Sequence, residues 1–155
     1  MDSHIVLHYL TQLAFTSRCV VVALRWCMAI RVVRLGSERG KGEGLRIGTV
    51  RRPPRGVPKS EFAARNFYDV WLPQLSPSAK LIKAALGAKS EREWNGFVKA
   101  YRREMSEPDA ARLLELLAAM SGSSAFSVGC YCENEARCHR SVLRALLQER
   151  GAKVR

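Results

Sequence analysis

Three cysteines near the end of the chain, followed by a histidine and an arginine, are the residues best suited to chemistry. Cys130, Cys132 and Cys138 fall within nine positions, and His139 and Arg140 come directly after the last of them. A thiolate is a strong nucleophile, and an adjacent imidazole can take up its proton. We therefore predict a catalytic group in which Cys138 is the reactive thiol, His139 carries the proton and Cys132 is a resolving partner.

The flanking residues indicate how this group is positioned. The apolar run 125–131 predicts a buried strand, and four later residues have helical spacing: Val142, Leu143, Leu146 and Leu147. Cys138 should then lie at the start of the last helix, where free backbone N–H groups and the helix dipole favour a thiolate. Ligands of open α/β sheets bind at the carboxyl ends of the strands. The sequence therefore predicts a ligand site at this strand-to-helix junction.

A second group of residues could hold an anion. A basic, proline-rich loop follows the predicted strand 45–50 and carries Arg51, Arg52 and Arg55. Guanidinium groups bind phosphate through paired hydrogen bonds, and first-turn residues of a helix can add to such a site. We expect one anion-binding wall, formed by Arg51, Arg52, Arg55, Arg140 and Ser141. Exposed loop arginines that only face solvent are the simpler alternative.

Other interpretations of the cysteine group remain open. Cys130, Cys132, Cys138 and His139 are enough ligands for zinc, but their spacing is unlike that of structural zinc sites. Cys130 and Cys132 would also point to opposite faces if the strand continued through both. A reversible disulfide, or simple packing of small buried thiols, is a further alternative. The sequence assigns no cofactor and no metal ligand, and the lack of an arginine six positions after Cys132 argues against a thiol phosphatase.

Composition limits the classes of protein that this chain can be. It has 155 residues, 47 % of them hydrophobic, and a formal net charge of +12. The apolar content excludes a disordered chain, and the charge favours an anionic partner: a nucleotide, nucleic acid or phosphorylated small molecule. One dense basic cluster comprises Arg46, Arg51, Arg52, Arg55 and Lys59. A non-catalytic nucleic-acid-binding module is therefore the main alternative to an enzyme, and a structural zinc domain is the second.

The first 27 residues fit the rest of the chain poorly. Arg18 and Arg25 interrupt their apolar run, which is too short for a membrane span, and the order of charge and apolar residues is wrong for a signal peptide. We expect residues 1–27 to be a non-native or poorly ordered extension before Met28, and residues 28–155 to form one domain. An odd number of cysteines, three of them close together, favours a reduced, cytoplasmic protein without a transmembrane segment.

The remaining patterns predict the fold class. Strands are expected near residues 29–35, 45–50, 67–72 and 125–131, because these stretches are short and rich in β-branched or aromatic residues. Ser76-Pro77, the capping box opened by Ser90, and Ser106 to Asp109 predict three helix starts between the third and fourth strands. The predicted architecture is a single-domain α/β layered sandwich with a small, mostly parallel central sheet flanked by helices.

An ordered set of motifs resembles one known family. These motifs are Arg46 to Thr49, Arg51 to Val57, Tyr68 to Pro73, Leu75 to Ser78, Trp94 to Phe97, and Cys132 to Ser141. Together they resemble domain-of-unknown-function family number 488, in the subgroup with a C-terminal Cys-x5-Cys-His-Arg unit. The resemblance covers roughly residues 28–154 and implies a small bacterial or archaeal cytosolic α/β protein. It implies no particular reaction.

Overall fold

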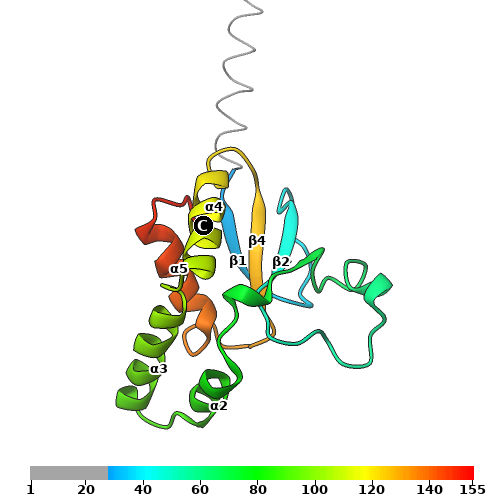
Figure 1. Ribbon diagram of the computed structural model, residues 1–155. Helices are drawn as coiled ribbons and strands as arrows, with labels where there is room; N and C mark the ends of the chain where they lie inside the picture. Colours follow the sequence, from blue (N-terminus) through cyan, green and yellow to red (C-terminus); the bar gives the residue numbers. More distant parts are fainter. Residues whose placement is uncertain (1–27) are drawn as a thin grey trace, which may run out of the picture.

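A four-stranded, all-parallel sheet forms the centre of the computed structural model, which describes residues 28–155 (Figure 1). Its strands are β1 (Ile30–Arg34), β2 (Leu45–Gly48), β3 (Val70–Trp71) and β4 (Phe126–Cys130), in the order β1-β4-β2-β3. Every neighbouring pair is parallel, so all four carboxyl ends lie at one edge. The last strand of the chain is thus a central one. The predicted extension, residues 1–27, lies outside the described residues.

Four helices follow or connect these strands. They are α2 (Ala79–Gly87), α3 (Glu91–Glu104), α4 (Pro108–Met120) and α5 (His139–Glu149), with 3-10 turns at Lys59–Glu61 and Pro73–Leu75. Helix α5 contacts β4, and both α3 and α4 contact α5 (Figure 1). The predicted fold class, a single-domain α/β sandwich, is confirmed. Within residues 28–155, no helix has the length and apolar character needed to cross a bilayer.

Apolar side chains gather in two clusters. The larger one joins the sheet to the helices, with Ile30 and Val128 from the strands fully buried against Leu114, Leu143 and Leu147. The smaller one lies at the carboxyl edge of the sheet and contains Leu35, Val50, Phe62, Tyr68, Cys130 and Cys138. Two of the predicted site cysteines therefore belong to a packed cluster, which restrains their side chains.

A buried ion pair supports the other face of the sheet. Arg46 is fully buried, and its guanidinium donates to both carboxylate oxygens of Glu43, at 2.6 and 2.9 Å. It also donates to the carbonyls of Ser37 and Asn66. Within the basic cluster of the sequence, Arg46 therefore differs from the loop arginines: its guanidinium holds the segment between β1 and β3 together instead of facing solvent.

The third strand is shorter than predicted. Only Val70 and Trp71 pair in the ladder with β2, whereas residues 67–72 were expected. Asn66 has a left-handed backbone (φ 60°) just before this stretch, and Pro73 removes a donor after it. The carboxylate of Asp69 accepts from the backbone N–H of Arg46, at 2.7 Å. A side chain thus replaces a strand bond at the edge of the sheet.

One of the three predicted helix starts is displaced. The capping box at Ser90 is present as expected, with Glu93 reaching back to the cap. Helix α2 is capped by Ser78, whose hydroxyl accepts from the backbone N–H of Leu81, and Ser76 instead ends the preceding 3-10 turn. Helix α4 begins within the predicted stretch, with Glu107 at its cap position, and the hydroxyl of Ser106 donates to the carbonyl of Arg102.

Candidate functional site

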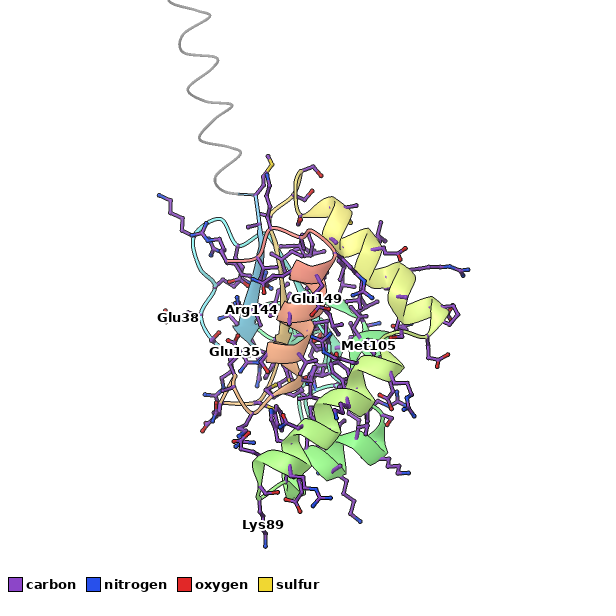
Figure 2. All side chains as sticks on the ribbon, turned by 90° about the vertical axis from the view of Figure 1, so that its left-hand side faces the viewer. Glu38, Lys89, Met105, Glu135, Arg144 and Glu149 are labelled. Carbon is purple, nitrogen blue, oxygen red and sulfur yellow. The ribbon has the colours of Figure 1, made fainter. Side chains whose placement is uncertain are left out.

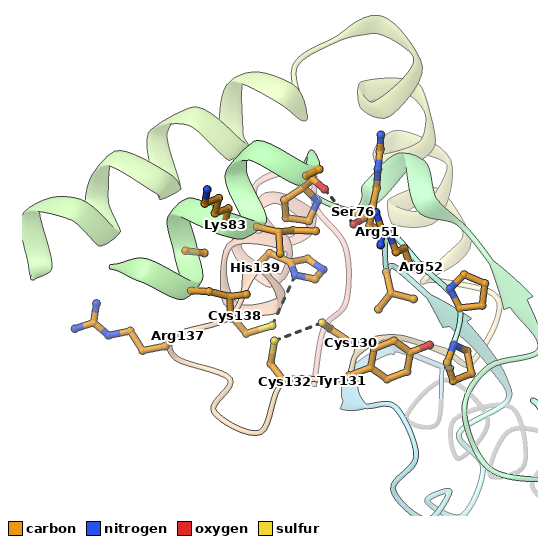
Figure 3. Close-up of a pocket in the computed structure, with 18 of the residues that line it drawn as sticks. Arg51, Arg52, Ser76, Lys83, Cys130, Tyr131, Cys132, Arg137, Cys138 and His139 are labelled. Carbon is orange, nitrogen blue, oxygen red and sulfur yellow. Dashed lines mark hydrogen bonds between the residues drawn. The ribbon is translucent and has the colours of Figure 1, made fainter. Parts of the chain in front are cut away.

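Three sulfur atoms meet at the carboxyl end of the central strand. Cys130 is the last residue of β4, and Cys138 is the N-cap of α5. The three Sγ atoms lie within 4.8 Å of one another, and those of Cys130 and Cys132 are 3.6 Å apart (Figure 3). Because β4 ends at Cys130, the chain turns and the two side chains converge. Cys130 and Cys132 would point to opposite faces of the sheet only if the strand continued through both, and it does not reach Cys132.

The imidazole of His139 is held between a carbonyl and a thiol. Its Nε2 lies 2.9 Å from the backbone oxygen of Thr49, and its Nδ1 lies 3.7 Å from Sγ of Cys138. A carbonyl oxygen can only accept, so Nε2 carries a proton, and in the neutral imidazole Nδ1 is then the acceptor that faces the sulfur. The ring of Tyr101 packs edge-on against the imidazole, with centroids 5.7 Å apart. This arrangement gives Cys138 an oriented proton acceptor.

Hydrogen bonds among the sulfurs distribute charge unevenly. Cys130 acts as a donor to its neighbours, which together with burial raises the pKa of its thiol far above the ordinary value. Hydrogen bonds from Cys130 and Cys138 lower the pKa of Cys132 to about 3, assisted by the positive charge of Arg140. The pKa of Cys138 is also lowered, chiefly by its hydrogen bond with Cys130 and further by His139. The hydrogen bonds therefore keep the proton on Cys130 and favour the thiolate form at Cys132 and Cys138.

The thiols open into a cavity of about 810 Å³ that the basic loop also lines. Arg51, Arg52 and Arg55 contribute to its wall, as do Lys83 of α2 and Arg137. The three loop arginines are exposed, and none of them forms an ion pair with any of the residues that the structure describes. The lining residues include five basic side chains and no acidic one. That balance makes the electrostatic potential inside the cavity positive.

Apolar side chains make up much of the opposite wall. Helix α2 has no buried residue, and its Ile82 and Leu86 face the cavity together with Phe97 of α3. Pro53 and Pro54 of the basic loop complete the apolar part. The cavity thus combines an apolar wall, a basic rim and a thiol group, which suits a ligand with an apolar or planar body and a negative charge.

A family model matches the chain over residues 30–151 and is described as DUF488-N3a, the active DUF488-N3 subclade. The chain belongs to this DUF488 family. Neither the search of curated proteins nor the search of solved structures returned a significant match. The matched range begins at the first residue of β1 and ends two residues beyond α5. All residues of the thiol group and the basic loop therefore lie inside the DUF488 match.

Two predicted anion-binding residues of this DUF488 domain lie outside the cavity wall. Arg140 is only 2 % exposed and donates through Nη2 to the carbonyl of Cys132, at 2.7 Å. Ser141 donates its hydroxyl to the carbonyl of Cys138, at 2.9 Å. The structure brings Arg51, Arg52 and Arg55 to the cavity together with the thiols. Arg140 and Ser141 belong to α5 and instead bind the backbone of the loop that carries Cys132 and Cys138. Their described contacts brace the 132–138 loop.

Ion pairs fix the outer part of the same loop. Arg144 of α5 donates to Glu135, at 2.8 Å (Figure 2), and Arg34 at the end of β1 donates to Glu133. Arg137 pairs with Glu91 and its guanidinium lies 5.5 Å from the ring centroid of Trp94. The DUF488 domain thus holds both ends and the middle of the loop, so the position of Cys132 is defined by several contacts.

Sequence reasoning missed three contributors to the site. The carbonyl of Thr49 orients His139, and Lys83 and Arg137 line the cavity. Thr49 directly follows β2, and β2 pairs in parallel with β4. Once this strand order is known, Thr49 is expected to lie near the residues that follow Cys130. Nothing in the sequence near Lys83 indicates that α2 folds back beside the thiol group.

Proposed function

We propose that this cavity binds a phosphate-bearing ligand at Arg51, Arg52 and Arg55, and that Cys138 is a reactive thiol that acts on it. The observation that carries the proposal is the orientation of His139 between the carbonyl of Thr49 and the sulfur of Cys138. A nucleophile beside a base, which is itself oriented by a third group, is the arrangement of enzymes that use covalent catalysis. Arg140 and Ser141 contribute by holding the backbone carbonyls of Cys132 and Cys138.

The chemistry follows from the positions of the atoms. The thiol proton of Cys138 moves to Nδ1 of His139, and the sulfur forms a bond to an electrophilic atom of the ligand. The displaced group then takes the proton from the imidazolium. Cys132 acts as the resolving partner when a hydroperoxide takes the place of the electrophile: the thiolate of Cys138 takes the outer oxygen, which gives a sulfenic acid and leaves the alcohol, and the thiol of Cys132 then condenses with the sulfenic acid, which forms a disulfide and releases water.

The reactive thiol is tested by alkylation with iodoacetamide at neutral pH, read at Cys138 by peptide mass spectrometry. We expect Cys138 to react at least about 10-fold more slowly in His139→Gln, because the variant lacks a basic acceptor for the thiol proton. Cys132→Ser serves as the control, since it leaves the contact between Cys138 and His139 in place. Equal rates in wild type and His139→Gln, or an inert Cys138 in the reduced wild type, would refute this part.

The anion site is tested with inorganic pyrophosphate by isothermal titration calorimetry. We expect the triple variant Arg51→Ala, Arg52→Ala, Arg55→Ala to bind at least about 10-fold more weakly, because hydrogen bonds to charged groups contribute about 1.5–3 kcal/mol each. The charge-matched control replaces Lys99, Arg103 and Arg112, which are exposed on α3 and α4 and outside the cavity. An equal loss in both triple variants would mean that net charge alone attracts the anion.

The net charge of +12 also supports a second candidate, a non-catalytic nucleic-acid-binding module. That function predicts binding of a single-stranded oligonucleotide that weakens steeply with salt and is unchanged in Cys138→Ser. The nucleic-acid-binding function would be favoured over the reactive thiol if only the variant of the three loop arginines lost oligonucleotide binding and the alkylation of Cys138 in that variant were unchanged. In either case we place the protein in the cytoplasm, where closely spaced free thiols remain reduced.

A further inference from the structure

We propose that Cys130, Cys132 and Cys138 form a three-sulfur site for a soft d10 cation, Zn²⁺ or Cu⁺, with a fourth coordination position open to the cavity. The inference goes beyond the proposed function, because one nucleophile and one resolving thiol leave the third sulfur, that of Cys130, unexplained. An ion bound here engages the sulfur of Cys138. The metal-loaded protein is therefore a blocked form of the same site.

The distances between the sulfurs suit such an ion. Thiolate ligands lie about 2.3 Å from zinc, which places two sulfurs of a tetrahedral site about 3.8 Å apart. Sγ of Cys130 and Sγ of Cys132 are 3.6 Å apart, and all three sulfurs lie within 4.8 Å of one another. Small side-chain rotations are enough to bring all three to bonding distance. The site is thus nearly formed before any ion arrives.

The chain keeps these sulfurs in place through its backbone. Cys130 ends a central strand, and Cys138 caps α5, so two of the three ligands belong to regular elements. Cys132 lies on the loop between them, and Arg140 holds its carbonyl by a hydrogen bond of 2.7 Å. Figure 3 shows the three side chains pointing toward one another, and all three line the cavity. Such pre-organisation removes part of the entropy cost of ion binding.

The surroundings can balance the charge of three thiolates. Arg140 is buried behind the loop, and its positive charge acts on the sulfur of Cys132. The backbone N–H of Arg140 donates to Sγ of Cys138 at 3.5 Å, at the positive end of the α5 dipole. Hydrogen bonds of this kind to the ligand atoms tune metal–thiolate sites. A divalent ion leaves one net negative charge, which the Arg140 guanidinium offsets.

The set of donors selects the type of ion. Among the described residues, the group that can hold an ion contains three sulfurs and neither an imidazole nor a carboxylate. Thiolates prefer Zn²⁺ and Cu⁺, whereas Mg²⁺ and Ca²⁺ require oxygen ligands. His139 donates from Nε2 to Thr49 and reaches only the sulfur of Cys138, so it stays outside the ligand set. All three cysteines line the cavity, which leaves the remaining position to water or a small ligand.

The experiment uses the full chain, reduced and stripped of metal with a chelator. Zn²⁺ is added in competition with a chromophoric zinc chelator, and Cu⁺ is added without oxygen in competition with a copper(I) chelator. We expect one ion per chain, and the chelator strength that each ion withstands identifies which of the two the site prefers. Cys130→Ala should lower the affinity for the preferred ion at least 100-fold.

Two control variants assign the ion to these sulfurs. The double variant Cys19→Ala, Cys27→Ala changes the two cysteines outside the described residues and should keep one ion per chain. His139→Gln should also keep it, because the imidazole is not a ligand. The proposal is overturned if the reduced protein binds neither ion, if Cys130→Ala retains the wild-type affinity, or if the double variant loses the ion.

The same variants separate this proposal from the proposed function. His139→Gln should slow the alkylation of Cys138 and still bind the ion. Cys130→Ala should lose the ion, and its metal-free Cys138 should still react with iodoacetamide in a way that depends on His139, although more slowly than in wild type because the hydrogen bond from Cys130 is gone. In wild-type protein, loading with the preferred ion should slow that alkylation at least 10-fold. Unchanged alkylation of the loaded protein would show that the ion binds elsewhere, and would overturn the three-sulfur site.

Discussion

Replacing Glu43 with glutamine should change how stability depends on pH. The carboxylate is 4 % exposed and accepts from Arg46, Ser127 and the backbone N–H of Gly40. Burial alone would raise its pKa, but these hydrogen bonds and the charge of Arg46 together lower it from 4.5 to about 2. Each pKa unit is worth about 1.36 kcal/mol, so the ionised carboxylate contributes about 3 kcal/mol to folding.

The sign of the effect follows from the lowered pKa. The contribution is fully present above the pKa of the unfolded chain and is lost as the pH falls from about 5 toward about 2. In Glu43→Gln the group cannot ionise, so that part of the pH dependence disappears. The variant is also less stable at pH 7, by about 3–5 kcal/mol, because Arg46 is left buried without its counter-charge.

The assay is urea denaturation followed by tryptophan fluorescence at pH values from 7 down to 3. The difference in unfolding free energy between wild type and Glu43→Gln should shrink by about 2 kcal/mol over this range, since most of the linkage falls between pH 5 and pH 2. Glu115→Gln, on the exposed side of α4, is the matched control and should follow the wild-type profile. A difference that stays constant from pH 7 to pH 3 would refute the reasoning.

Three further predictions concern the elements that position the site. Gly44→Ala should cost at least about 2 kcal/mol in urea denaturation, because Gly44 has φ +72° and a Cβ there would lie 1.9 Å from the carbonyl oxygen of Ala125; wild-type stability would contradict this. Ser90→Ala removes a cap that accepts from Glu93 and should cost about 1 kcal/mol, seen as a melting temperature lower by about 2–4 °C. Tyr101→Phe should cost about 1 kcal/mol in the same urea assay, because its hydroxyl donates to the buried carbonyl of Leu75 at 2.7 Å; an unchanged midpoint would mean that water replaces the donor.

The sequence identified the strand-to-helix junction because local patterns determine it. The apolar run before Cys130 and the helical spacing after Cys138 each depend on near neighbours in the chain. The convergence of the sulfurs could not be predicted in the same way. It depends on β4 ending at Cys130 and on the contact of Arg140 with the carbonyl of Cys132, and the point where a strand ends is set by its partners.

Burial of charged residues was the other feature that local patterns could not predict. Arg46 alternates with apolar residues in β2, as an exposed strand residue would, yet it lies under the segment that carries Glu43. Arg140 was expected to face a ligand because it follows Cys138 and His139, and its guanidinium turns inward instead. Whether an arginine side chain faces the cavity or is buried in support of the fold depends on which segments of the chain pack over it.

The central position of β4 has a consequence for the synthesis of the chain. Strand β1 pairs with β4 alone among the strands, and β2 has only the two-residue β3 beside it until β4 arrives. A ribosome that has released β1, β2 and β3 therefore exposes strands that have no stable partner, and the sheet can form only when the last quarter of the chain emerges. The residues that complete the sheet are also those that carry the thiols. A nascent chain stopped before residue 126 should therefore lack both the folded sheet and any reactive group at its edge.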